Sequence, residues 1–201
     1  MKDFCVKDIV RAVGGSLLCG DENVQIDNFA TNSGNAEPGL MFAPIVGERV
    51  DGHKYIESAF DCGASASLTQ NEEAVAGLID KWRSLGIQPK PIVLAEDSVR
   101  AMQLTAKEYE SRLSLNKVGV TGSVGKTTTK EMIACALSGG LKVFKTAGNA
   151  NSQIGVPVTI MNIAPDDEAA VIEMGMSHFG EISRLSQTAQ PTIGVITNIG
   201  Y

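Results

Sequence analysis

Apolar residues recur at helical spacing in four stretches of the chain. Positions three and four apart share one face of a helix, so this spacing predicts amphipathic helices. The stretches cover residues 6–13, 55–60, 75–82 and 98–113, and Gly14 and Gly63 follow the first two, where helices commonly end. Short apolar runs at 64–68 and 91–94 predict strands. Residues 1–97 therefore predict a small mixed α/β domain.

From residue 117 the pattern changes to strands that alternate with helices. Strands are expected at 118–121, 142–145, 169–173 and 192–197. Alternation of this kind implies right-handed crossovers and a parallel sheet, with ligands at the carboxyl ends of its strands. We predict that residues 98–201 hold a connector helix and the first part of a phosphate-loop ATPase domain. Such a sheet would be incomplete, so we interpret the chain as a piece of a longer protein.

Composition excludes several classes of protein. The 201 residues are 43% hydrophobic, without the roughly 18 to 20 consecutive apolar residues of a membrane span. The first residues lack a secretory signal, so we expect a cytoplasmic protein, and we expect it to be a monomer. A net charge of −6 with no basic tract argues against nucleic acid as a partner.

Cysteines and histidines do not show metal-ligand spacing. Cys5, Cys19, Cys62 and Cys135 are scattered, which favours free thiols in a reducing compartment. His53 and His178 have no neighbouring His or Cys at ligand spacing, so we interpret both as hydrogen-bonding residues.

A glycine-rich turn at residues 119–130 lies between a predicted strand and a predicted helix. The backbone N–H groups at a helix start attract phosphate, and glycine allows its close approach. Lys126 would reach the terminal phosphates and the Thr127 hydroxyl would bind Mg²⁺. The first glycine, Gly119, stands one position earlier than the general pattern requires, and a structural glycine turn is the alternative.

Further candidates follow the next strands. Glu173 ends an apolar strand, where it would be a Mg²⁺ ligand or, alternatively, a solvated acid. Residues 148–151 and 154–157 combine small amides with glycine and proline, as in a loop that closes over a ligand or a polar turn before a helix. Lys130 and Glu131 are expected on a solvated helix face.

Together, five segments resemble the Mur ligase family of peptidoglycan synthesis: residues 121–131, 146–151, 154–157, 173–177 and 196–200. Residues 38–42, 47–49, 51–53 and 63–64 are similar to the uridine-nucleotide-binding N-terminal domain of that family. Residues 129–131 and 173–177 most resemble the branch that joins D-alanyl-D-alanine to UDP-N-acetylmuramoyl-tripeptide.

The resemblance implies ATP-dependent amide-bond formation through an acyl phosphate, with ATP and Mg²⁺ as cofactors and a fragment that is inactive alone. It assigns catalysis to Lys126 and Glu173 and metal binding to Thr127 and Glu173. The implied nucleotide contacts are Gly122, Ser123, Val124, Gly125, Lys126, Thr127, Thr128 and Asn149. The implied substrate contacts are Ser33, Gly47, Asp51, His53, Asn151 and Ser177.

The chain departs from the family pattern in two places. Residues 32–34 lack the arginine that the family commonly carries there, so only Ser33 carries over, and residues 151–153 read Asn-Ser-Gln in place of Asn-Asn-Glu or Asn-Asn-Asp. Two alternatives stay open: a sister ligase that adds a single amino acid, and a non-catalytic nucleotide-binding relative. A GTPase is less favoured, because no Asn-Lys-x-Asp tetrapeptide occurs.

Overall fold

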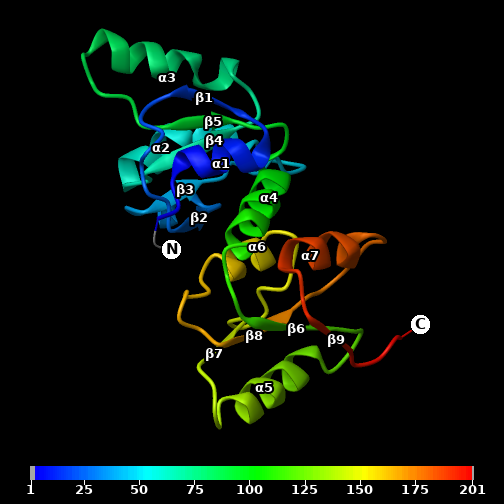
Figure 1. Ribbon diagram of the computed structural model, residues 1–201. Coiled ribbons are helices and arrows are strands. Elements are labelled where there is room, and N and C mark those ends of the chain that lie inside the picture. The colour runs from blue at the N-terminus through cyan, green and yellow to red at the C-terminus, as the bar shows by residue number, and fades with distance from the viewer. Residues whose placement is uncertain (1–2, 201) are drawn as a thin grey trace. The chain divides into compact units, whose positions relative to one another are not determined.

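A computed structural model describes residues 3–200 (Figure 1). The chain divides into two compact units between Thr105 and Ala106, inside helix α4 (Ser98–Glu110). No helix among the described residues is long and apolar enough to cross a bilayer.

The first unit is built on a five-stranded sheet in the order β1-β5-β4-β3-β2. β1 runs antiparallel to β5, and the other neighbours are parallel. The strands are β1 (Ser16–Cys19), β2 (Asn28–Ala30), β3 (Leu40–Phe42), β4 (Ala66–Thr69) and β5 (Ile92–Leu94). The helices are α1 (Val6–Val13), α2 (Ile56–Cys62) and α3 (Glu73–Ser84), with short 3₁₀ turns at Ser33–Asn35 and Gly52–Tyr55.

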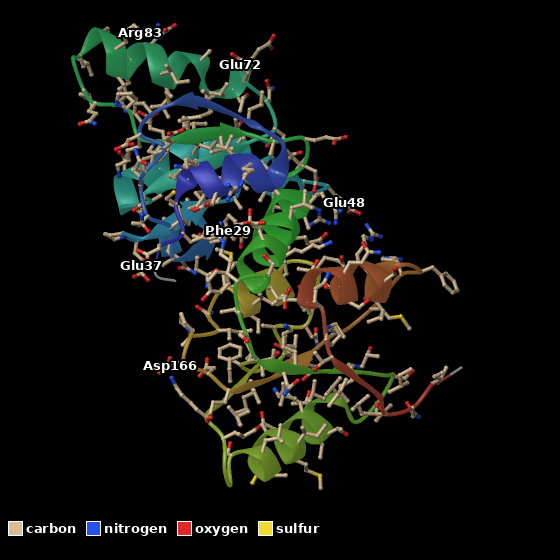
Figure 2. The ribbon with its side chains drawn as sticks, viewed as in Figure 1. Phe29, Glu37, Glu48, Glu72, Arg83 and Asp166 are labelled. Carbon is tan, nitrogen blue, oxygen red and sulfur yellow. The ribbon has the colours of Figure 1, made fainter. Side chains whose placement is uncertain are left out.

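Apolar faces of α2 and α3 pack with the sheet to form the core of this unit. Phe42, Ile56 and Ile92 are buried there, and Trp82 meets Phe60 edge to face at 5.3 Å between ring centroids. Figure 2 shows Glu72 and Arg83 at opposite ends of α3. An acid at the start of a helix and a base at its end complement the helix dipole.

The second unit holds a four-stranded, wholly parallel sheet in the order β7-β8-β6-β9. The strands are β6 (Asn116–Thr121), β7 (Val143–Lys145), β8 (Ala169–Glu173) and β9 (Ile193–Ile196), and the helices are α5 (Lys126–Leu137), α6 (Gly155–Ile160) and α7 (Glu181–Ala189). α5 covers one face of the sheet, and α6 and α7 cover the other (Figure 1). Val118, Val120 and Val171 pack with Ala134 of α5, as expected for strands buried on both faces.

The expected fold class is confirmed: a mixed α/β unit followed by a parallel-sheet unit with a glycine-rich turn after its first strand. Two elements differ from the expectation. The segment at residues 154–157 begins helix α6, because Pro157 falls in the first helical turn, where its missing N–H costs nothing. Helix α4 ends at Glu110 rather than near Leu113, and the chain continues in turns in which the N–H of Arg112 and of Leu113 each donates to a carbonyl three residues earlier.

Candidate nucleotide-binding site

The turn between β6 and α5 has the backbone geometry of an anion cradle. Gly122 has a φ of 137° and Gly125 a φ of 85°, both in the region that favours glycine. Gly125 is the N-cap of α5 and makes no side-chain capping bond. The N–H groups at the start of α5 therefore lack a capping side chain and can bind phosphate oxygens.

The two glycines meet different surroundings. A Cβ on Gly122 would lie 2.2 Å from Thr197 Oγ1, whereas the nearest atom to a Cβ on Gly125 would be 3.9 Å away. The segment after β9 braces the turn: Ser123 N donates to Asn198 O at 3.0 Å and Val124 N to Asn198 Oδ1 at 3.2 Å. Gly122 thus permits close packing on this segment, a role that the sequence pattern did not indicate, while Gly125 leaves space for a ligand.

Lys126 lies over the turn. Its Nζ donates to Gly122 O at 2.6 Å and to Ser123 O at 3.3 Å. The ammonium group is therefore held at the mouth of the cradle, where it can interact with bound phosphate.

Glu173 is buried at the carboxyl end of β8, with 1% of its surface exposed. Its Oε1 accepts from Asn151 Nδ2 at 2.7 Å and from Thr127 Oγ1 at 3.2 Å. Its Oε2 is buried and has no hydrogen-bond partner among the described residues. Burial excludes the solvated-acid interpretation.

A buried carboxylate oxygen that accepts no hydrogen bond from the described residues, beside a hydroxyl, is a donor set that fits a divalent cation. A buried polar atom without a partner costs free energy, and a bound cation would remove that cost. Mg²⁺ prefers oxygen ligands, which the Glu173 carboxylate and the Thr127 hydroxyl supply. These two residues could therefore hold Mg²⁺.

The position of Lys130 differs from the one expected from the sequence. We expected it on a solvated helix face, but it is fully buried. Its Nζ donates to Thr146 O at 2.8 Å and to Gly148 O at 3.0 Å, and lies 3.7 Å from Glu173 Oε2. Lys130 follows Lys126 by four residues, so both lie on one face of α5, but this spacing does not by itself indicate that Lys130 is buried.

Glu131 is half-exposed, in keeping with the expected solvated face. It accepts from Lys145 Nζ, and its Oε1 lies 3.2 Å from Lys130 Nζ. The hydrogen bond from Lys145, followed by that from Lys130, lowers the pKa of the Glu131 carboxyl.

A pocket of about 390 Å³ opens beside the cradle. Three predicted site residues, Lys126, Asn151 and Ser177, line it together with Glu181. Glu181 Oε2 accepts from the N–H groups of Ser177 at 2.6 Å and His178 at 2.9 Å, and these two bonds lower the pKa of its carboxyl. Sequence reasoning missed Glu181.

Asn149 is exposed in the turn that follows β7 and does not line this pocket. Its carbonyl accepts from Asn151 N at 2.7 Å. Its nucleotide contact stays a prediction.

The first unit carries its own pocket, of about 570 Å³. Its lining residues follow the carboxyl ends of β2 and β3 or belong to the turn before α2: Thr31, Asn32, Ser33, Phe42, Ile45, Gly47, Val50, Gly52 and Tyr55. Two of the predicted substrate contacts, Ser33 and Gly47, are among them. The other two, Asp51 and His53, are not.

Asp51 and His53 form a hydrogen-bonded pair in the same segment as the lining residues Val50 and Gly52. Asp51 Oδ1 accepts from His53 N at 2.9 Å and lies 2.6 Å from His53 Nδ1, and Gln70 N donates to Nε2 at 2.9 Å. The bond from Gln70 makes Nε2 an acceptor, so the proton sits on Nδ1 and is donated to Asp51. His53 is thus confirmed as a hydrogen-bonding residue, and its backbone N–H, then its ring, lower the pKa of the Asp51 carboxyl.

Metal-ligand clusters of three or more His, Cys, Asp or Glu residues do not occur within residues 3–200. The four cysteines are free thiols, as the sequence predicted.

The fold and the cradle agree with a match to known proteins. Residues 120–201 match the family model described as the Mur ligase middle domain. The chain belongs to the Mur ligase family, and it corresponds to the N-terminal part and a portion of the middle part of the MurF-type ligases.

The similar proteins include both sequences and solved structures. The UDP-N-acetylmuramoyl-tripeptide–D-alanyl-D-alanine ligase of Bacillus subtilis is 41% identical over 97% of this chain and 41% of its own length. A MurF structure from Acinetobacter baumannii aligns with a TM-score of 0.82 at 26% identity, covering 98% of this chain and 41% of that one. MurF from Thermotoga maritima, solved in complex with ADP, aligns with a TM-score of 0.72 at 34% identity, covering 88% of this chain and 38% of that one. The chain thus spans about two fifths of the length of these relatives.

Proposed function

We propose that this chain supplies the nucleotide-binding and uridine-binding parts of an ATP-dependent ligase. The enzyme would join D-alanyl-D-alanine to UDP-N-acetylmuramoyl-tripeptide. The observation that carries the proposal is the buried Glu173 carboxylate, whose Oε2 accepts no hydrogen bond from the described residues, beside Thr127 and the Lys126 cradle. The named activity of the relatives and the ADP complex of one of them support the nucleotide and the substrates.

Each residue has a part in bringing two anions together. The N–H groups at the start of α5 and the Lys126 ammonium bind and orient the phosphates of ATP. Thr127 and Glu173 would hold Mg²⁺, which when bound would offset phosphate charge. The substrate carboxylate attacks the γ-phosphorus, the bond to the β-phosphate oxygen breaks, and ADP leaves an acyl phosphate. The amine of the dipeptide then attacks the acyl carbon, loses a proton and displaces inorganic phosphate. Positioning and charge compensation supply the catalysis.

The pocket of the first unit is proposed to receive the uridine end of the substrate. Its lining is neutral, with hydroxyl and amide groups from residues 31–33 and the ring of Tyr55. A nucleobase can be recognised by such a combination of stacking and hydrogen bonds. The second-unit pocket lined by Asn151, Ser177 and Glu181 is proposed to receive the peptide end near the phosphates.

The test is phosphate release by the protein at its natural full length, with ATP, Mg²⁺ and UDP-N-acetylmuramoyl-tripeptide. We expect release to require D-alanyl-D-alanine and to yield the pentapeptide product. Release supported by a single amino acid, with its own UDP-linked peptide, would assign the chain to a sister ligase. ATP binding without release under either condition would assign it to a non-catalytic relative.

A further inference from the structure

Lys130 is a buried cation that the proposed mechanism does not use. Its side chain is fully enclosed, and an enclosed ammonium is costly unless it is paired and hydrogen-bonded. Here its partners are the carbonyls of Thr146 and Gly148, with the carboxylates of Glu131 and Glu173 at 3.2 and 3.7 Å. The ammonium thus joins helix α5 to two segments that belong to the site.

The first of these segments is the turn that follows β7. Lys130 holds its start through the two carbonyls, while Asn151 at its end donates to Glu173 Oε1 at 2.7 Å. The Thr146 hydroxyl also accepts from Glu173 N at 2.9 Å. The turn that presents Asn149 is therefore fixed at both ends to the same carboxylate residue.

The second segment is the end of β8. Lys130 Nζ lies at ion-pair distance from Glu173 Oε2 but beyond hydrogen-bond distance. The ammonium therefore compensates the charge of Glu173 without donating a hydrogen bond to the oxygen that is proposed to bind the cation. An apolar side chain of similar length could fill the same volume but could neither compensate this charge nor donate to the two carbonyls.

We propose that Lys130 is a positioning residue for binding of the nucleotide and its divalent cation. It holds the turn at residues 146–151 and the Glu173 carboxylate in the arrangement that receives them. The proposal rests on the proposed function, because it assumes that the cradle binds ATP. It acts through Glu173 and the turn, not by contact with the substrate.

The experiment compares three variants of the protein at its natural full length. Lys130→Met removes the ammonium and keeps most of the volume. Lys130→Gln keeps an N–H donor for the carbonyls and removes the charge. Lys145→Met is the matched control, because Lys145 pairs with the same Glu131 but is half-exposed.

Two quantities are measured: the Kd for Mg²⁺ with a non-hydrolysable ATP analogue, by calorimetry, and the KM for each substrate. Loss of a group that orients a metal ligand typically costs about 10- to 100-fold in affinity or activity. We expect Lys130→Met to raise the Kd and the KM for ATP by at least about tenfold, with the KM for the UDP-linked peptide changed less than about twofold. Lys130→Gln is expected to show a smaller rise in the same direction, and Lys145→Met no change.

An equal loss of binding for ATP and for the UDP-linked peptide would overturn the proposal. A nucleotide Kd for Lys130→Met equal to that of Lys145→Met would also overturn it. If Lys130→Met does not fold, Lys130→Gln decides by the same Kd. If the unmodified protein binds the ATP analogue but does not ligate, the proposed function fails while the effect of Lys130 on nucleotide binding is still measured. If the unmodified protein does not bind the analogue, both fail.

Discussion

Each of the two units has a pocket at the same kind of position in its sheet, but the residues around the two pockets suit different chemistry. In each unit the pocket lies where parallel strands end, as expected of open α/β sheets. The pocket of the second unit adjoins two buried charged side chains, Glu173 and Lys130, which lie at ion-pair distance from each other. Asn151 donates a hydrogen bond to Glu173. The pocket of the first unit is lined by neutral side chains, and Asp51 and His53, which hydrogen-bond to each other, are not among its lining residues.

This difference agrees with what each pocket is proposed to hold. Phosphate anions and a cation require charges fixed in advance, because unfixed charges would be screened or would reorganise in solvent. A nucleobase is neutral, so stacking and a few hydrogen bonds suffice. A buried charge network in one unit and a neutral wall in the other are what we would expect of a division of labour in which the second unit bound the nucleotide and the first unit captured the substrate.

The largest expected effect comes from the cradle. Lys126→Ala removes the ammonium that lies over the turn, where it donates hydrogen bonds to the carbonyls of Gly122 and Ser123. We expect ligation by the full-length protein to fall by at least about 10²- to 10³-fold, since a lost charge-stabilising donor in a reaction site costs that much. The measurement is product formation, with circular dichroism to verify that the fold is intact.

Lys142→Ala is the matched control for this substitution. Lys142 is half-exposed and pairs with Asp166 and Asp167, away from the cradle. If Lys126→Ala ligates at the unmodified rate, the assignment of this turn as the phosphate-binding cradle is wrong.

A smaller effect is expected in the first unit. Tyr55 lines the neutral pocket and is 39% exposed, so its ring is available to a base. Base–aromatic stacking contributes about 1–3 kcal/mol, and Tyr55→Ala should raise the KM for the UDP-linked peptide by about tenfold. The KM for ATP should not change, which is the reverse of the pattern expected for Lys130→Met.

Lys54→Ala serves as the control for Tyr55→Ala. Lys54 Nζ lies 5.2 Å from the centre of the Tyr55 ring but does not line the pocket. An equal rise in both KM values for Tyr55→Ala would contradict the division of labour.

The sequence predicted the elements better than it predicted their cross-connections. Alternating apolar runs located the strands of the parallel sheet, and the glycine spacing located the cradle, because both depend on local backbone requirements. Glu173 could be recognised because it ends a strand whose carboxyl end must lie beside the cradle. Local patterns were therefore sufficient where a single strand or turn determines the position of a residue.

Lys130 and Gly122 show where local patterns fail. A lysine in a helix is usually solvated, and only the packing of α5 against the turn after β7 makes this one buried. Gly122 is required by Thr197, which is 75 residues away in the sequence. Likewise, Pro157 suggested a loop, but it lies in the first turn of α6. In each case the decisive neighbour is distant in sequence or depends on where a helix begins.

The smallest expected effect concerns the pH dependence of stability, and it compares one carboxylate in each unit. Asp51 accepts from His53, and Glu181 accepts from the N–H groups of Ser177 and His178. In both, these bonds lower the pKa of the folded-state carboxyl below its ordinary value of about 3.9 for Asp or 4.3 for Glu. A carboxyl whose folded pKa is lowered stabilises the fold above its unfolded pKa, and this contribution is lost as the pH falls through the folded pKa.

Asp51→Asn and Glu181→Gln should each therefore lower the Tm by a few degrees at pH 7, and the difference from the unmodified protein should shrink below about pH 4. Thermal unfolding followed by circular dichroism between pH 7 and pH 2.5 measures this. Asp80→Asn is the control, because Asp80 is exposed on α3 and pairs with the equally exposed Arg83 three residues later. A Tm difference that persists or grows at low pH would show that the amide variants act through lost packing. The charge of the two carboxylates would then not stabilise their turns. The two units would share the position of their pockets but not this source of stability.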